Sequence, residues 1–292
     1  MRGNMWQSFA PQNQVEFVLP HIKLSGRLWG AKDKPLLLAL HGWLDNANSF
    51  EPLAEYLPHY QILAIDWPGH GFSAHRPGHY PLHWIDYLYD LDALLAMLPQ
   101  KPLAIIGHSL GGIIASAYTA TFPEKVNKLI LIEALSPLFE SAMQAKTRLR
   151  KSFYQHEKFL AQKHKQLKVY DNMDTAVKAR VHLTGLAEPW CRLLLERNMQ
   201  PTTDGVAWRS DPRLRLDSPI RLTFEQVDAL MQHISVSTLL ICGKQGFSQL
   251  QAALPKARKW FTHLSEHMLE GDHHVHMDNA KGVAHLIQQF VE

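Results

Sequence analysis

The chain has 292 residues, of which 46% are hydrophobic and 20% charged, so it can bury a sizeable core and does not have the composition of a disordered protein. Its net charge of +3, with the histidines neutral, is too small to predict binding to nucleic acid. No apolar run approaches the roughly 18 residues of a membrane span. The start, MRGNMWQSFAPQ, lacks the apolar core of a signal peptide, and the two cysteines lie far apart, so we expect a cytoplasmic protein.

Short strands and amphipathic helices alternate over the first 133 residues. Segments 15–19 and 22–29 flank a Pro-His turn and predict an opening hairpin. Continuous apolar runs, typical of strands covered on both faces, follow at 36–40, 62–65, 103–106, 129–132 and 239–241. Helical patterns lie between several of them, at 50–57, 82–98 and 112–121. This alternation predicts an α/β protein with a mostly parallel, doubly wound sheet.

The alternation stops in residues 134–232, which are helical in texture and turn-prone near Gly205, Pro212 and Pro219. We therefore divide the chain into a first core part at 1–133, a helical insertion at 134–232 and a second core part at 233–292. Between Lys146 and Lys168, eight basic residues accompany one acid, Glu157. Either a solvated helix face or a surface for an anionic partner or membrane would account for this density.

The segment LAIIGHSLGGIIASAY places G-x-S-x-G between a predicted strand and a predicted helix. A sharp turn there would hold Ser109 in a strained backbone conformation, and Gly107 and Gly111 would leave room for neighbouring backbone. The helix N-terminus would direct its free N–H groups toward the same place. Ser109 is therefore a candidate nucleophile, and the alternative is a serine that caps the helix.

The sequence resembles the α/β-hydrolase superfamily over nearly the whole chain. The resemblance rests on three segments: the G-x-S-x-G segment, His41-Gly42-Trp43 after the third strand, and DWPGHGFS after the fourth. Within the superfamily, the pairing of HGWLDNANSF with HHVHMDN is most similar to the serine hydrolase-like proteins. The resemblance implies an α/β-hydrolase fold with a helical cap inserted after the sixth strand. It also implies an oxyanion hole made by the backbone N–H groups of Trp43 and Leu110, with His41 and Asp66 in structural roles.

The segment LEGDHHVHMDNA supplies three histidines near the C-terminus, His273, His274 and His276. Neighbouring imidazoles can bind zinc, but no further ligands form a recognisable pattern, so we predict no metal site. Relatives carry their general base in a pattern like G-H-x-x-H-x-E. By that resemblance His273 is the base, Asp272 stands where glycine is usual, and His274 is the alternative.

The acid of the expected triad is missing from its usual place. In many relatives it lies three residues after the glycine that ends the late strand, and that position is Gly246. Glu133 ends the preceding buried strand at the sheet edge where such sites assemble, and haloalkane dehalogenases take their acid from this strand end. We predict Glu133 as the acid. The alternatives are that it only caps the entry to the insertion, or that Asp211, Asp228 or no acid takes part.

The resemblance implies a serine hydrolase that cleaves a carboxylic ester of a small to medium apolar substrate through an acyl-enzyme, without cofactor or metal. A serine where dehalogenases and epoxide hydrolases carry aspartate argues against those two activities. The cap would lie over an apolar pocket, with walls expected from Trp43, Trp67, Phe139, Met143, Trp190 and Trp208. The alternatives are a non-catalytic binding or scaffold protein on the same fold, an acyltransferase, or a hydrolase of carbon–carbon bonds.

Overall fold

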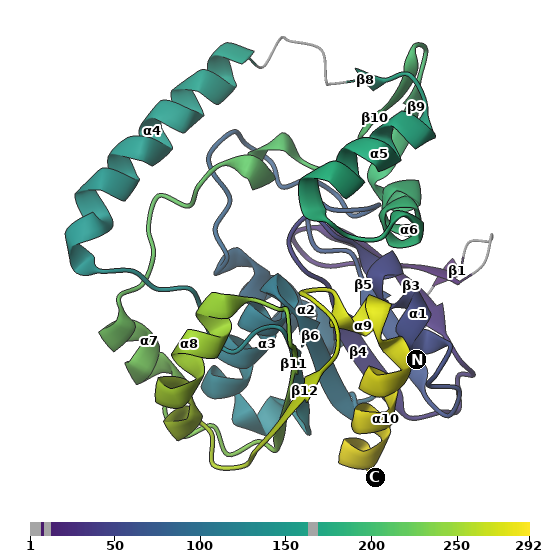
Figure 1. Cartoon of the computed structure of the whole chain (residues 1–292), viewed down its shortest axis with the longest axis vertical. Coiled ribbons are helices and arrows are strands. Elements are labelled where there is room, and N and C mark those ends of the chain that lie inside the picture. Colours follow the sequence, from purple (N-terminus) through teal and green to yellow (C-terminus); the bar gives the residue numbers. More distant parts are fainter. Residues whose placement is uncertain (1–6, 9–12, 163–168) are drawn as a thin grey trace.

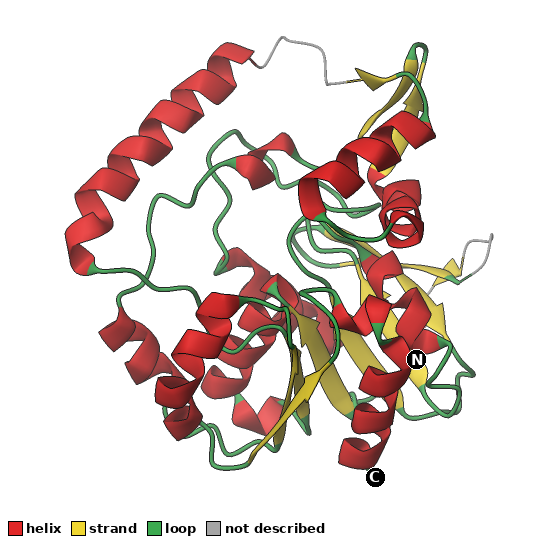
Figure 2. Ribbon diagram, viewed as in Figure 1, coloured by secondary structure: helices red, strands yellow, loops and turns green. Residues whose placement is uncertain are grey.

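The computed structural model describes residues 7–8, 13–162 and 169–292 (Figure 1). Two expectations concern residues that partly lie outside these ranges. They are the basic segment, which includes Lys163, Lys165 and Lys168, and the interpretation of the first twelve residues. The described chain forms one large sheet flanked by helices, with a small three-stranded sheet that lies above it in this view (Figures 1 and 2).

The large sheet has nine strands in the order β1-β2-β3-β5-β4-β6-β7-β11-β12. Their bounds are β1 (Gln7–Ser8), β2 (Gln14–Val18), β3 (Lys23–Trp29), β4 (Leu36–Leu40), β5 (Gln61–Ile65), β6 (Ala104–His108), β7 (Leu129–Ile132), β11 (Thr238–Gly243) and β12 (Leu264–Leu269). The first three strands run antiparallel to their neighbours, including β3 against β5. All pairs from β5 to β12 are parallel, which confirms the predicted mostly parallel sheet.

The central strands β4, β6 and β7 are buried along their whole length because helices cover both faces of the sheet (Figure 2). One face carries α2 (Asp86–Met97), α3 (Leu110–Thr121), α7 (Phe224–Met231) and α8 (Ser248–Ala257). The other carries α1 (Glu51–Ala54), α9 (Val275–Asp278) and α10 (Ala280–Val291). The register pairs Leu40 with Gly107, His108 with Ile132, and Ile132 with Ile241. The loops after β4, β6, β7 and β11 therefore all leave the sheet on the same side, at the carboxyl ends of the strands.

β12 is a strand that the sequence prediction did not locate. Its residues are partly buried or exposed and none is fully buried, because β12 is an edge strand of the sheet with a neighbour on one side only. The run HLSEHML contains too few apolar residues to resemble the strands at the centre of the sheet.

The segment between β7 and β11 is largely helical and also contains three short strands, which the sequence analysis did not predict. It holds α4 (Ala145–Gln162), α5 (Met173–Thr184), α6 (Glu188–Asn198) and α7, and also a sheet of β8 (Val169–Tyr170), β10 (Gly205–Trp208) and β9 (Met199–Thr202). The two residues Thr203 and Asp204 join β9 to β10 as a tight hairpin, in which Gly205 pairs with Thr202. The insertion follows the sixth strand if the two-residue β1 is not counted. Part of it, α7, packs on α3 and belongs to the main core.

Candidate active site

Ser109 lies in a sharp turn between β6 and α3. Its backbone has φ 48° and ψ −114°, a conformation that a residue with a side chain rarely adopts. A Cβ on Gly111 would lie 2.0 Å from the carbonyl oxygen of Leu40, so the turn requires glycine there. The serine side chain makes no capping hydrogen bond to α3, which argues against the helix-cap alternative. The turn leaves the hydroxyl free for chemistry.

The loop after β4 is tied to this turn through His41. The carbonyl oxygen of His41 accepts from the N–H of Gly111 at 3.1 Å, and its Nε2 accepts from the N–H of Trp67 at 3.0 Å. Its Nδ1 donates to the carbonyl of Gly42 at 2.7 Å. Burial lowers the pKa of His41 to about 4, so the ring is neutral at pH 7. His41 therefore holds the loop in place, as the sequence predicted.

The N–H groups of Trp43 and Leu110 are the predicted oxyanion donors. Neither donates a hydrogen bond to another group within the described residues. Trp43 follows Gly42, whose Cβ position would lie 2.9 Å from His108 Nδ1, and His108 is the residue before Ser109. Leu110 is the first residue of α3. An unpaired donor thus directly follows Ser109, and the loop that carries Trp43 lies against the residue before it.

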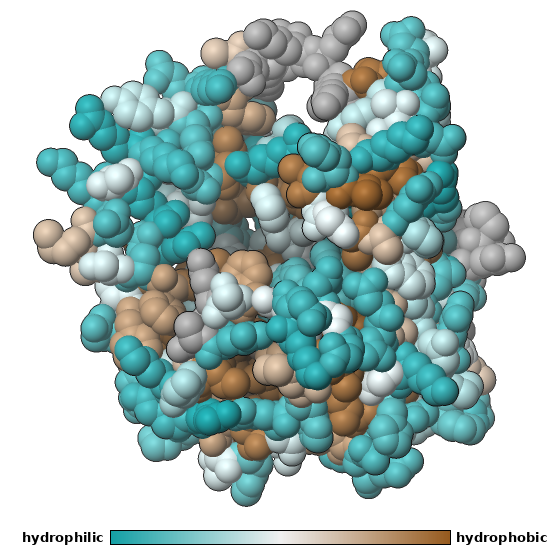
Figure 3. Space-filling model, viewed as in Figure 1, coloured by the Kyte–Doolittle hydropathy of each residue, from teal (hydrophilic) through white to brown (hydrophobic). Residues whose placement is uncertain are grey.

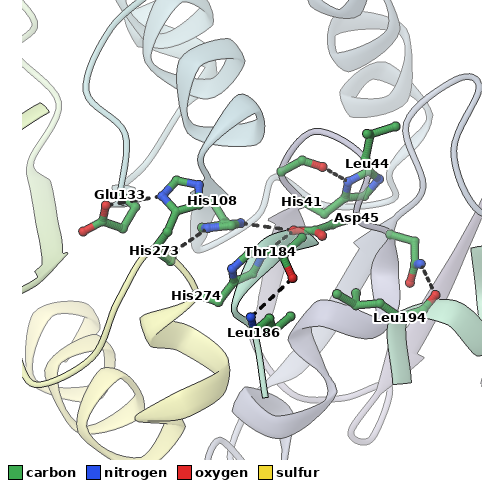
Figure 4. A network of polar contacts seen from close by, with 12 residues as sticks. His41, Leu44, Asp45, His108, Glu133, Thr184, Leu186, Leu194, His273 and His274 are labelled. Atoms are coloured by element: carbon green, nitrogen blue, oxygen red, sulfur yellow. Dashed lines mark hydrogen bonds and ion pairs between the residues drawn. The ribbon is translucent and has the colours of Figure 1, made fainter. Parts of the chain in front are cut away.

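Glu133 is a buried carboxylate whose oxygens are both engaged. Its side chain is 1% exposed. Oε1 accepts from the N–H of Gly243 and Oε2 from the N–H of Phe247, each at 2.7 Å. His273 Nδ1 lies 3.4 Å from Oε2 (Figure 4). The backbone of Glu133 has φ 52°, and positive φ at a non-glycine residue is typical of functional sites. Two backbone donors and an imidazole satisfy this carboxylate in the protein interior.

The position of Gly246 has no room for a side chain, because Glu133 fills the space beside it. A Cβ on Gly246 would lie 2.1 Å from Oε1 of Glu133 and 2.5 Å from the carboxyl carbon. The carboxylate that leaves β7 therefore fills the space that a side chain at position 246 would need. The alternative acids are engaged elsewhere. Asp211 forms an ion pair with Arg213, and Asp228 accepts from the indole of Trp260 and pairs with Lys259.

Replacing Gly246 with alanine should lower kcat while the fold persists. The φ angle of Gly246 is outside the left-handed region, so the new methyl group acts by displacing the Glu133 carboxylate from His273. A shift of about 1 Å in a catalytic group costs roughly 10²-fold in rate. Steady-state kinetics on an activated ester measures this loss. In a protein that already carries Glu133→Gln, Gly246→Ala should lower kcat little further. If the two substitutions instead lowered kcat by the product of their separate effects, the steric explanation would be contradicted.

Ser109, Glu133 and His273 line one cavity of about 450 Å³. Its remaining walls are mostly apolar and come from Ile113, Ala134, Leu135, Ser136, Pro137, Leu138, Phe139, Phe247, Leu250, Ala253 and Lys256. The side chain of His273 is 31% exposed. Ser109 and His273 form no hydrogen bond with each other within the described chain. The structure therefore brings the three predicted residues to one cavity, with the serine and the imidazole not yet in hydrogen-bond contact.

Of the predicted pocket residues, Phe139 lines this cavity and the others lie elsewhere. Trp67 is fully buried in the core, and Met143 is 85% exposed. The indole of Trp190 donates to Asp278 at 2.8 Å, and Trp208 lines a separate depression beside Phe72. The indole of Trp43 donates to the carbonyl of Leu214 at 2.9 Å.

The walls that the sequence prediction missed come from residues 134–138 and from α8. The apolar run ALSPLF directly after Glu133 could have indicated the first group, because it must leave the sheet at the edge where the site lies.

His274, the alternative base, is engaged by a different carboxylate. Its Nε2 lies 3.2 Å from Oδ2 of Asp45, and Asp45 also pairs with Arg180 Nη2 of α5 at 2.8 Å (Figure 4). Burial lowers the pKa of His274, but the charge and hydrogen bond of Asp45 outweigh burial and leave that pKa raised. His108 Nε2 donates to the carbonyl of His273 at 2.8 Å and so fixes the loop that carries both histidines. This arrangement favours His273 as the base.

The insertion is attached to the core through buried polar contacts next to the site. Arg197 of α6 donates to both oxygens of Asp66, at 2.9 and 2.8 Å from Nε. Asp66 also accepts from the N–H groups of Ala47 and Phe72, each at 2.8 Å. Asn46 Nδ2 donates to the carbonyl of Leu194 of α6 at 2.8 Å. Asp66 therefore holds loops together, as predicted, and fastens the insertion to them.

Four buried histidines should make the fold acid-sensitive. Burial lowers the pKa of each: to about 4 for His41, about 3 for His70 and His276, and well below the ordinary value for His108. In the unfolded chain these rings bind protons below about pH 6.5, whereas in the folded chain they do not, so acid favours unfolding. His274 has the opposite effect on stability. Its pKa is raised in the folded protein, so its protonated ring stabilises the fold at low pH, and this stabilisation is lost as the pH rises through the pKa of the folded state.

The free energy of unfolding should therefore fall between about pH 6.5 and 4, by up to about 1.4 kcal/mol per pH unit for each of the four rings. Urea titrations at a series of pH values measure how steeply this free energy changes with pH, which gives the number of protons taken up on unfolding. His276→Phe should reduce that number by about one. Uptake of fewer than about one proton by the unmodified protein would contradict the assignment of these rings as neutral in the folded state.

Comparisons with known proteins identify the family. The model of the alpha/beta hydrolase fold family matches residues 35–280. A serine hydrolase-like protein of Danio rerio is 28% identical over 290 residues, covering 96% of this chain and 88% of the relative. The crystal structure of a hypothetical protein from Pseudomonas aeruginosa has 33% identity and a TM-score of 0.86, with 95% of this chain and 99% of that one covered. A thioesterase domain from the curacin biosynthetic pathway has 25% identity and a TM-score of 0.78, with 96% and 100% covered. The chain belongs to the family with the α/β-hydrolase fold, and its relatives there include serine hydrolase-like proteins.

Proposed function

We propose that this protein is a serine hydrolase that cleaves carboxylic esters of small to medium apolar substrates through an acyl-enzyme. The observation that carries the proposal is the convergence of Ser109, His273 and Glu133 on one cavity. Ser109 Oγ attacks the ester carbonyl, and His273 accepts its proton and later protonates the leaving alcohol. Glu133 orients the imidazole and stabilises it when charged.

The oxyanion that develops on the carbonyl would be held by the N–H groups of Trp43 and Leu110. Each donor of this kind is worth roughly 2.7 to 4 kcal/mol in the transition state. Water then attacks the acyl-enzyme with His273 as base, which releases the acid and restores Ser109. No cofactor takes part in these steps. The thioesterase named among the similar structures supports acyl transfer as the class of chemistry.

The cavity sets the substrate class that we propose. Its volume of about 450 Å³ and its aliphatic and aromatic walls suit an acyl group of modest length. Leu138, Phe139 and Phe247 give it apolar sides, and the carboxylate of Glu133 is already occupied by two backbone donors.

A second candidate is a non-catalytic binding protein that holds a small apolar ligand in the same cavity. One observation favours it: Ser109 and His273 are not hydrogen-bonded to each other within the described residues. Hydrogen bonds of this kind are often long in unliganded hydrolases and shorten when substrate is bound. The second candidate predicts ligand binding without turnover.

The test is a series of p-nitrophenyl esters of increasing acyl length, with a fluorophosphonate probe as an independent label of Ser109. A hydrolase of the proposed class shows a burst of p-nitrophenol, an optimum at short to medium chains, and labelling at Ser109. Added alcohol should not divert the acyl group into a new ester; if it does, the protein is an acyltransferase. Absence of both turnover and labelling would identify the binding protein.

A further inference from the structure

Helix α4 is an 18-residue helix that runs along the outside of the molecule (Figure 1). One face is fastened to the rest of the chain. Ser152 is buried and donates to the carbonyl of Asp217 at 3.3 Å, and Gln155 Nε2 donates to Oδ2 of Asp217 at 3.2 Å. Arg148 forms an ion pair with Glu140. These contacts fix which side of the helix faces outward.

The outward face of α4 carries large apolar side chains. Phe153 is 69% exposed, Leu149 47% and Leu160 41%, and their spacing of four and seven residues places them on one stripe of the helix. Tyr154 beside them is also exposed. A contiguous apolar stripe on the surface of a water-soluble protein marks an interaction site more often than isolated exposed residues do.

Basic side chains border this stripe. Lys146 and Lys158 have no ion-pair partner among the described residues, and Arg150 donates to the hydroxyl of Tyr154 at 3.3 Å. Glu157 is the one acidic residue of the helix. Hydrophilic side chains dominate the helix in the space-filling view, at its upper left (Figure 3). The exposed face therefore combines three cations, one carboxylate and an apolar stripe.

We infer that α4 docks on an anionic lipid surface. The apolar stripe enters the boundary between headgroups and acyl chains, and the cations meet the lipid phosphates and carboxylates. The helix is convex and stands at the rim of the molecule, so a deformable bilayer can cover it, whereas a folded partner would need a matching groove. None of the helices in the described residues has the length and apolar character to cross a bilayer, so docking is peripheral.

Docking would also place the cavity near the bilayer. Phe139 lines the cavity with Ser109, and the chain continues from it through Glu140 and the short 3-10 helix Ala142–Gln144 into α4. The inference concerns where the protein sits and does not depend on the chemistry of Ser109, so either can fail without the other.

The experiment is flotation of the full-length protein with two kinds of vesicle, phosphatidylcholine alone and phosphatidylcholine mixed with phosphatidylserine. The test variant is Lys146→Glu with Phe153→Ser. The matched control is Lys178→Glu with Leu183→Ser on α5, which makes the same charge change and removes a comparably exposed apolar side chain. Circular dichroism checks that both variants are folded.

Unmodified protein and the control should float with the phosphatidylserine vesicles, and added salt should reduce the floated fraction. The α4 variant should lose at least about tenfold in apparent affinity. No flotation of the unmodified protein, or equal loss in the control, overturns the inference. A concentration-dependent dimer that Phe153→Ser abolishes, without flotation, assigns the face to a second copy of the chain. Capture by polyglutamate without flotation assigns it to an acidic protein.

Discussion

Replacing Ser109 with alanine should lower kcat for ester hydrolysis by roughly 10⁶-fold, because a hydrolase that loses its nucleophile keeps only the rate that binding and oxyanion stabilisation provide. Fluorophosphonate labelling should disappear with it. The fold should persist, since the hydroxyl makes no capping hydrogen bond to α3. Steady-state kinetics with a short p-nitrophenyl ester measures the loss, and intact-protein mass spectrometry measures the label.

Ser136 provides the matched control for this prediction. It is a second serine on the wall of the same cavity, and its hydroxyl donates to the carbonyl of Pro137 at 3.3 Å. Ser136→Ala should keep kcat within about threefold and keep the label. If Ser109→Ala retained the label or its turnover, another nucleophile would have to be sought.

Replacing Glu133 with glutamine should lower kcat by roughly 10³ to 10⁴-fold, because an amide neither stabilises a charged imidazole nor selects the same tautomer. The amide nitrogen would also face the N–H of Gly243 or Phe247, which leaves a buried donor without an acceptor at a cost of about 1 to 3 kcal/mol in stability. The free energy of unfolding should therefore be measured beside kcat, at a temperature where the variant is fully folded.

Glu140→Gln is the control for the glutamine substitution. Glu140 pairs with Arg148 and does not line the cavity, so its replacement makes the same chemical change outside the site. This variant should keep kcat within about threefold. Equal losses in the two variants would mean that charge removal, and not the position of Glu133, lowers the rate.

The parts of the fold that the sequence predicted are those that local pattern determines. β4 and β7 are continuous apolar runs because both faces of these strands are covered, and that property is visible in the letters. The turn at Ser109 follows from glycines at positions where a Cβ would collide with backbone. β12 lies at the edge of the sheet, where one-sided burial leaves a mixed composition that no simple pattern distinguishes from a loop.

The candidate site was predictable where a residue violates the pattern around it. Glu133 is a carboxylate at the end of an apolar strand, and Gly246 is a glycine where many relatives carry an acid. In the structure the Glu133 carboxylate occupies the space that a side chain at position 246 would fill. The pairing of Asp45 with His274 was not predictable, because the partners are 229 residues apart and each has an ordinary local context. The pocket walls were missed for a related reason: whether Met143 or Leu138 faces the cavity depends on the path of the chain after β7.

We propose that the acid, Glu133, reaches His273 from β7 through the space that Gly246 leaves free. The most direct measurement is kcat of Glu133→Ala beside kcat of the double variant Glu133→Ala with Gly246→Asp, which returns a carboxylate from the β11 side. We expect the single variant to lose at least about 10³-fold and the double variant to recover at least about tenfold of that loss. A Glu133→Ala protein that hydrolyses esters at the rate of the unmodified enzyme would contradict the account.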